Sequence, residues 1–283
     1  MSEQAVVPIL VVENARDAPV ARLGDWLVAA GAELDVRALH AGDELPELAG
    51  YRALVVLGGG MNAYDDVRAP WLPAVRALLS EAVRIELPTL GICLGGQLLA
   101  VATGGRVALA QAPEYGAQLI AKRQAAATDP LLREMPITPD VLQWHVDEIS
   151  QLPPGAVQLA SSPGCELQAF RVGRLAWGTQ FHLETTPDII AQWAAEDAEL
   201  LADYDLPTIV ERAVRAHEDI AEVWQPIAAR FVEIARDPAA VAGPRSLPMA
   251  GGTVSTAAPI TDPAAIRAAL AAEMQAARGP HGQ

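Results

Sequence analysis

The chain has 283 residues, of which 51% are hydrophobic, enough for one large α/β domain or two small ones. The formal net charge of −15 and the presence of only two cysteines, Cys93 and Cys165, argue against a nucleic-acid partner, a disulfide framework and a zinc site. Because the apolar run near the N-terminus lacks a basic flank and is too short to span a bilayer, we expect a cytoplasmic protein with no membrane partner.

Strands and helices alternate up to Gly105. Apolar runs such as VVPILVVE are short, β-branched and continuous, which is typical of strands buried on both faces of a sheet. Amphipathic segments separate these runs, and Gly31 is placed to end the first helix. The alternation predicts an α/β fold with a doubly wound, mostly parallel sheet. The expected strands are 6–13, 33–39, 51–57 and 87–93, and the expected helices are 18–32, 70–84 and 94–105.

After Gly105 the pattern changes to short β segments that turn sequences such as LPPG and SSPG separate. Helix returns at 187–204. The expected β segments are 116–124, 141–149, 156–162, 165–173 and 174–182.

A longer helix then carries apolar residues at steps of three and four from Ile209 to Ile234, with His217 placed among acidic residues on a solvated face. The segment that follows is rich in Pro, Gly and Ala. We therefore divide the chain into a domain at 1–202, a helical extension at 203–236 that packs on it, and a disordered tail at 237–283 with a possible short helix.

Cys93 lies where a predicted strand gives way to a predicted helix, in the sequence GICLGG. Ligands of doubly wound sheets bind beyond the carboxyl ends of the strands, so this corner is a candidate site. The sequence is the G-x-C-x-G form of a nucleophile elbow, and the helix N-terminus after it favours a thiolate and an oxyanion. The alternative is a small buried cysteine of the sheet, and the local pattern alone leaves both open.

A thiolate nucleophile needs a base and a group that orients the base. His182, in GTQFHLE, is predicted at a strand end, with Glu184 two residues on. Since side chains at i and i+2 of a strand project to one side, Glu184 can hold the imidazole while His182 faces the thiol. The glycine run 57–60 ends another predicted strand, where its backbone amides can approach a ligand.

The two motifs GICLGGQLLA and GTQFHLE, in this order and separation, resemble those of the class I glutamine amidotransferase family, over roughly residues 6–202. The resemblance implies a flavodoxin-like fold with a Cys93 nucleophile, a His182 base and a Glu184 carboxylate. It further implies that backbone amides of Gly59, Gly60 and Leu94 form the oxyanion hole. Gln97, Trp144 and His145 are the substrate-binding residues that it implies.

The chain departs from the family pattern at two positions. Leu183 stands in place of the usual proline of the F-H-P-E motif, which should leave the His–Glu pair intact. Gly96 stands where many members have a bulkier residue, and we expect it to leave room for a larger leaving group. The longer similarity points to a stand-alone subgroup, some members of which resemble γ-glutamyl peptide hydrolases.

We predict cysteine-dependent hydrolysis of a small-molecule γ-glutamyl amide through a thioester, with no cofactor and no metal. One alternative is a glutaminase subunit that supplies ammonia to a separate synthase partner; a homo-oligomer is also compatible with the sequence. A second alternative is a binding or regulatory module that kept the fold without catalysis, and the intact Cys–His–Glu set argues against it.

Overall fold

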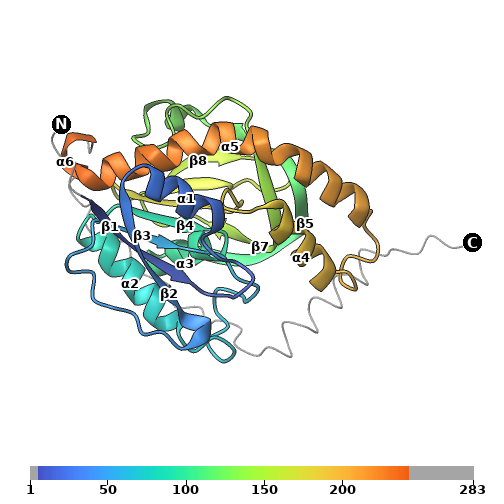
Figure 1. The fold of residues 1–283 in the computed structure, drawn as a ribbon, viewed down its shortest axis with the longest axis horizontal. Coiled ribbons are helices and arrows are strands. Elements are labelled where there is room, and N and C mark those ends of the chain that lie inside the picture. Colours follow the sequence, from blue (N-terminus) through green and yellow to red (C-terminus); the bar gives the residue numbers. More distant parts are fainter. Residues whose placement is uncertain (1–5, 242–283) are drawn as a thin grey trace, which may run out of the picture.

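A twisted eight-stranded sheet forms the centre of this computed structural model, which describes residues 6–241 (Figure 1). Five strands, from β2 to β10 in the sheet order, pair in parallel, and the last three pair antiparallel. The mixed α/β fold with a mostly parallel sheet is therefore confirmed. The strand order is β2 (Ala32–Ala38), β1 (Val7–Glu13), β3 (Ala53–Val56), β4 (Thr89–Ile92), β10 (Ala176–Thr179), β9 (Ala169–Val172), β8 (Val157–Ser161) and β6 (Ala121–Lys122).

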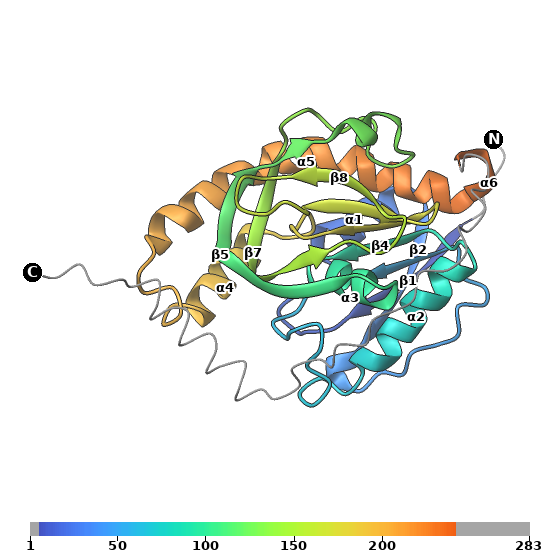
Figure 2. The same ribbon diagram turned by 180° about the vertical axis from the view of Figure 1, so that it is seen from behind.

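Helices cover both faces of the sheet (Figures 1 and 2). α1 (Ala21–Ala29) and α5 (Leu206–Arg236) pack on one face together with α4 (Pro187–Glu196), whereas α2 (Leu72–Arg84) and α3 (Leu94–Ala102) pack on the other. The sequence of β1 is a continuous apolar run because both faces of the strand are buried. Ile9 and Val11 belong to the first core and Leu10 and Val12 to the second, because successive side chains point to opposite faces.

Two long strands, β5 (Arg106–Leu119) and β7 (Asp140–Gln151), form a separate antiparallel arm that curves beside the sheet (Figure 2). The predicted strand at 116–124 covers the end of β5 and the short strand β6, but not the first part of β5. The register of the β5–β7 pairing shifts between Leu109 and Glu114. This irregularity interrupts the alternation of apolar and polar residues by which a strand is recognised, so the first half of β5 was missed. Short 3-10 turns, Leu39–Ala41 and Gln124–Thr128, and a final one-turn helix, α6 (Pro238–Val241), complete the described part.

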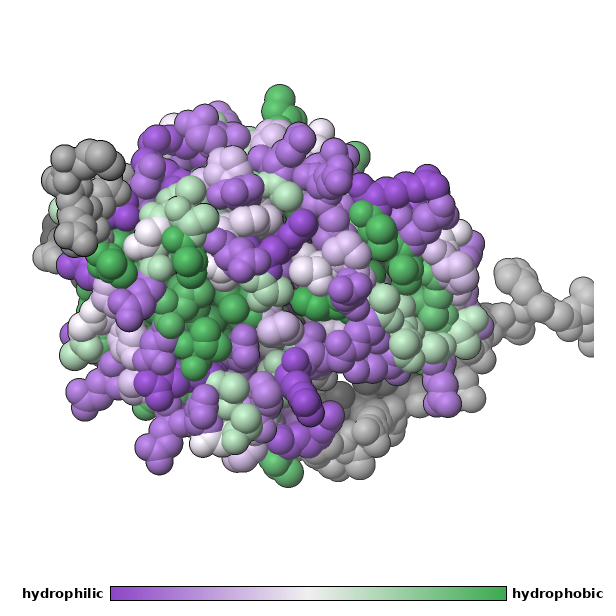
Figure 3. Space-filling view, in the orientation of Figure 1, coloured by the Kyte–Doolittle hydropathy of each residue, from purple (hydrophilic) through white to green (hydrophobic). Residues whose placement is uncertain are grey.

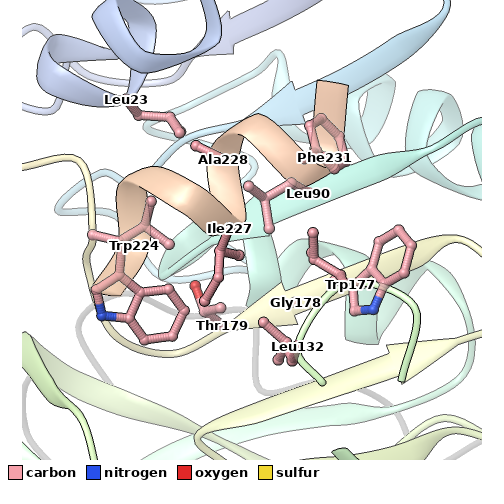
Figure 4. A pocket seen from close by; sticks show the side chains of 12 residues that line it. Leu23, Leu90, Leu132, Trp177, Gly178, Thr179, Trp224, Ile227, Ala228 and Phe231 are labelled. Carbon is pink, nitrogen blue, oxygen red and sulfur yellow. The ribbon is translucent and has the colours of Figure 1, made fainter. Parts of the chain in front are cut away.

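Helix α5 buries one stripe of its 31 residues against the sheet and α1. Figure 4 shows Trp224, Ile227 and Phe231 of this helix facing Leu90 and Trp177 of the sheet, around an apolar cavity of about 10 Å³. A cavity of that size holds at most one water molecule, so we interpret it as a small packing gap rather than a ligand site.

The placement of His217 on a solvated face of α5 was wrong. Its side chain is only 3% exposed, because it lies on the same stripe as Ala213 and Ile220. Nδ1 lies 2.6 Å from the carbonyl oxygen of Ala213, and Nε2 lies 3.3 Å from Oγ1 of Thr185. Burial lowers the pKa of His217, which favours the neutral imidazole.

The predicted helical extension at 203–236 corresponds to α5, and the division of the chain at residue 202 stays a prediction. Of the predicted tail, residues 242–283 lie outside the described residues. On the face that carries α1 and α5, hydrophilic groups surround patches where hydrophobic groups gather (Figure 3). Within residues 6–241, no helix is long and apolar enough to cross a membrane.

Replacing Phe231 with alanine tests whether α5 is part of the core. Its ring is fully buried and packs edge-to-face on Trp177, with centroids 6.4 Å apart. We expect Phe231→Ala to lower the free energy of unfolding by about 3–5 kcal/mol, since it removes apolar contacts and leaves a cavity. Urea titration followed by circular dichroism measures the loss. Val214→Ala, at a position 42% exposed on the same helix, should change it by less than about 0.5 kcal/mol.

Candidate active site

Cys93 occupies a strained turn between β4 and α3. Its backbone has φ +50° and ψ −109°, a conformation that residues with a side chain rarely adopt. The Cys93 N–H donates to the carbonyl of Thr179 at 2.8 Å, and its own carbonyl accepts from the N–H of Gln97 at 2.9 Å. Strain of this kind costs about 1–3 kcal/mol and persists only where neighbouring structure enforces it.

Close packing of α3 against the sheet enforces that turn. A Cβ added at Gly95 would lie 1.9 Å from the carbonyl oxygen of Val56 in β3. Only glycine fits at this contact, because no backbone rearrangement of a central strand can make room for a methyl group. The helix N-terminus is therefore pressed directly against the end of β3, next to Cys93.

The expectation that Gly96 leaves room for a larger leaving group was wrong. A Cβ at this position would lie 2.5 Å from the carbonyl oxygen of Thr179, in the backbone of β10. Gly96 does not line the cavity that contains Cys93. Its lack of a side chain serves the packing of α3 on the sheet rather than the entry of substrate.

His182 and Glu184 form a buried pair just after β10. Nδ1 of His182 lies 2.7 Å from Oε1 of Glu184, and the two side chains are 3% and 1% exposed. The His182 N–H donates to the carbonyl of Leu142 in β7 at 2.8 Å, which fixes the backbone of the pair. The N–H of Leu183 donates to Oε2 of Glu184 at 2.9 Å, a bond that a proline at this position could not make.

The electrostatics of the pair favour a charged imidazole. Burial by itself would lower the pKa of His182, but the charges of Glu184 and Cys93 and hydrogen bonds with both raise it to about 10. With Nδ1 facing the carboxylate, Nε2 is left as the ring nitrogen that can exchange a proton with a reacting group. The ring of Trp193 packs against the imidazole, with centroids 4.8 Å apart.

A cavity of about 110 Å³ brings these groups together. Cys93 and His182 both line it, and both are almost entirely buried. The other lining residues are Asp17, Ala18, Gly59, Gly60, Trp144, Trp193, Glu196 and Asp197. Among the residues that the structure describes, no group of three or more His, Cys, Asp or Glu side chains could hold a metal ion.

The glycine run at the end of β3 lies beside the nucleophile. Gly59 and Gly60 line the cavity, and Asn14 holds the run in place by donating from Nδ2 to the carbonyl of Leu57 at 2.9 Å. Leu94 is the first residue of α3, so its amide has no acceptor within the helix. The amides that would form an oxyanion hole are thus close to Cys93.

Residues 14–192 match the family model of the class I glutamine amidotransferases. The chain belongs to this family. A glutamine amidotransferase structure from Thermotoga maritima superposes with a TM-score of 0.73 and 28% identity, covering 81% of this chain and all of that chain.

Among curated relatives, a glutamine-hydrolyzing GMP synthase of Thermomicrobium roseum is 39% identical over 130 residues, 46% of this chain and 23% of that protein. One subunit of the glutamine-hydrolyzing GMP synthase of Methanocaldococcus jannaschii is 32% identical over 131 residues, 46% of this chain and 63% of that protein. The matched region of this chain spans about a quarter of the length of the first GMP synthases that it resembles.

The three residues that the amidotransferase resemblance assigned to substrate binding differ in their position relative to the cavity. Trp144 lines the cavity, where its Nε1 donates to Asp197 at 2.8 Å. Gln97 is buried, does not line the cavity and donates to the carbonyl of Asp147 at 3.1 Å. His145 lies with Nδ1 3.0 Å from that same carbonyl and Nε2 3.1 Å from Glu114. Substrate contact by Trp144, Gln97 and His145 stays a prediction.

Several residues at the cavity escaped the sequence analysis. Gly58, beside the lining residues Gly59 and Gly60, lies near the pair: a Cβ there would be 3.1 Å from Cε1 of His182 and 3.8 Å from Cβ of Cys93. Its place in the glycine run was the available signal. Trp193, Glu196 and Asp17 come from segments with no recognisable motif, and only the fold brings them to the cavity.

Replacing Gly58 with alanine tests how tightly the imidazole is held. The new methyl group would push on His182, which cannot yield because Glu184 and Trp193 fix it on other sides. Since displacements of about 1 Å can cost 100-fold in rate, we expect kcat to fall about tenfold. Gly60→Ala, whose Cβ would meet nothing within 4 Å, should cost less. Steady-state kinetics giving the reverse order would contradict this geometry.

The pH dependence of activity tests the role of Glu184. Because the pKa of His182 is raised to about 10, the imidazole keeps its proton as the pH rises and loses it only near that value. We expect activity to fall on the alkaline side near pH 10. Glu184→Gln removes the carboxylate charge that raises the pKa, so the alkaline fall should move to lower pH and kcat should drop at least about 100-fold.

The control for this experiment is Glu218→Gln, which removes the same charge from an exposed position of α5. It should leave the pH profile of kcat/KM unchanged. An alkaline fall at the same pH in Glu184→Gln and wild type would show that this carboxylate does not set the protonation of His182.

Proposed function

We propose that the chain hydrolyses the amide bond of a γ-glutamyl substrate through a covalent thioester on Cys93. The observation that carries the proposal is that Cys93, on its strained turn, shares one cavity with the buried His182–Glu184 pair. The names of the relatives, which are glutamine amidotransferases and glutamine-hydrolysing synthases, support chemistry at the amide of a glutamyl side chain.

In the first half of the reaction, the Cys93 thiolate attacks the γ-carbonyl carbon and a C–S bond forms. The amides of Gly59, Gly60 and Leu94 are the donors available to the oxyanion, each worth about 3 kcal/mol if it is well aimed. The tetrahedral species then breaks its C–N bond, and His182 gives its proton to the leaving nitrogen. Glu184 holds the imidazole and stabilises its charge throughout.

In the second half, a water molecule attacks the thioester carbon. The now neutral His182 takes a proton from this water, and the C–S bond breaks. Glutamate leaves, the proton of its new γ-carboxyl group passes to solvent, where the released amine takes it up, and the thiolate and imidazolium are restored. The net reaction is a γ-glutamyl amide plus water to glutamate plus a free amine, with no oxidant or reductant involved.

A second candidate function is the supply of ammonia to a separate synthase. The similarity to a relative that is itself named as one subunit of a GMP synthase favours it. The two candidates differ in which substrate the isolated chain accepts. A hydrolase releases glutamate from γ-glutamyl amides without a partner, whereas a glutaminase subunit is expected to act on glutamine and to depend on its synthase.

The two cysteines provide a direct test of the proposal. Cys93→Ala should abolish glutamate release from γ-glutamyl amides while the circular dichroism spectrum stays native. Cys165→Ala should retain activity, because Cys165 is buried in a turn away from the cavity and burial raises the pKa of its thiol. Activity in Cys93→Ala, or its loss only in Cys165→Ala, would overturn the assignment of the nucleophile.

A further inference from the structure

Three carboxylates line the cavity that holds Cys93. Asp17 follows β1, and Glu196 and Asp197 lie at the end of α4. An acidic cluster alone identifies no ligand. Here the same cavity contains a buried nucleophile and its base, so a substrate must enter it and pass these carboxylates.

Neutral donors, rather than basic side chains, hold the carboxylates of Glu196 and Asp197. Asp197 accepts from Nε1 of Trp144 and Glu196 from Nε2 of Gln192, each at 2.8 Å. In the part of the chain that the structure describes, no arginine or lysine forms a salt bridge with Asp17, Glu196 or Asp197. Their negative charge is therefore available to a ligand.

Two tryptophan rings connect the acids to the catalytic histidine. Trp193 packs on His182, and its Nε1 donates to the carbonyl oxygen of Asp17 at 2.8 Å. Trp144 lies next to Trp193, with ring centroids 5.9 Å apart, and hydrogen-bonds Asp197. Aromatic faces beside carboxylates attract a cation through their quadrupole as well as through charge.

The position of these residues relative to His182 indicates which part of the substrate they meet. In the proposed reaction His182 protonates the leaving nitrogen, so the leaving amine lies beside the imidazole. Trp193 packs on that same imidazole and Trp144 packs on Trp193. The backbone of Asp17 is hydrogen-bonded to the first ring and the side chain of Asp197 to the second. These acids therefore belong to the side of the leaving amine.

Resting on the proposed function, we infer that the preferred substrate is a γ-glutamyl amide whose leaving amine carries a second, positively charged group, as a γ-glutamyl diamine does. The cation lies between the tryptophan rings and the carboxylates of Asp17, Glu196 and Asp197. The leaving group of free glutamine is ammonia, which has a single nitrogen and carries no second charged group. It therefore makes no contact with these three carboxylates.

A matched pair of substrates tests the inference on the full chain. One is the γ-glutamyl amide of 1,3-diaminopropane, and the other is γ-glutamyl-n-butylamide, in which a methyl group replaces the ammonium. We expect kcat/KM for glutamate release to favour the diamine amide about tenfold or more at low salt, the scale of a few partly exposed charge contacts. The preference should shrink as ionic strength rises, because salt screens exposed charges.

The double variant Glu196→Gln/Asp197→Asn should bring the ratio of the two kcat/KM values close to one. Its control, Glu199→Gln/Glu218→Gln, removes the same charge from two exposed positions that do not line the cavity and should keep the wild-type ratio. A double variant that slows both substrates equally would show that the acids bind the α-ammonium of the glutamyl group, and the inference would be overturned.

The outcomes separate this inference from the proposed function. If the wild type cleaves both amides at equal rates, or prefers the butylamide, with both activities lost in Cys93→Ala, the hydrolase proposal stands and the cation preference is wrong. If the wild type cleaves glutamine but neither of the two amides, the hydrolase proposal stands and the cation preference is wrong. If it releases glutamate from neither amide and from no glutamine, the hydrolase proposal fails and the inference fails with it.

Discussion

The site depends on one steric constraint, the contact between the start of α3 and the carboxyl end of β3. Gly95 permits this contact because a Cβ there would overlap the carbonyl oxygen of Val56. Once the helix lies so close to the sheet, the chain between Ile92 and Leu94 must turn within a single residue, and Cys93 adopts a positive φ. The strain at Cys93 is thus supported by packing of the surrounding core, and it holds the thiol at the cavity and next to a helix N-terminus.

The segment that carries His182 is held by α1 and α5, on the face of the sheet opposite to α3. Arg22 of α1 donates from its backbone N–H to the carbonyl of Glu184 and from its guanidinium to the carbonyl of His217. His217, buried on α5, lies within reach of Thr185, the residue after Glu184. Helix α5 therefore contributes to the site without lining the cavity, since its packed stripe holds the segment that carries His182 and Glu184.

Local patterns in the sequence were sufficient for the alternating elements and for the His182–Glu184 pair, because strand ends and a spacing of two residues fix these relations within short segments. At Cys93 the local pattern left a buried structural cysteine open, and only its combination with the downstream His–Glu motif favoured the elbow. Long-range packing determined what the sequence left out. Glu196 and Asp197 reach the cavity because α4 ends at Glu196, whereas the periodicity predicted helix to Tyr204. Gly96 and His217 were misjudged for the same reason, since the neighbours that each one meets come from distant segments.

The central claim is that Cys93 forms a covalent γ-glutamyl thioester, and mass spectrometry of acid-quenched protein tests it most directly. After the full chain is mixed with a γ-glutamyl amide and quenched within the first turnovers, peptide mapping should find one γ-glutamyl group on the peptide that contains Cys93. Hydroxylamine added before the quench should remove this group as the γ-glutamyl hydroxamate. Turnover of substrate with no adduct on Cys93 under these conditions, or an adduct on Cys165 instead, would contradict the account.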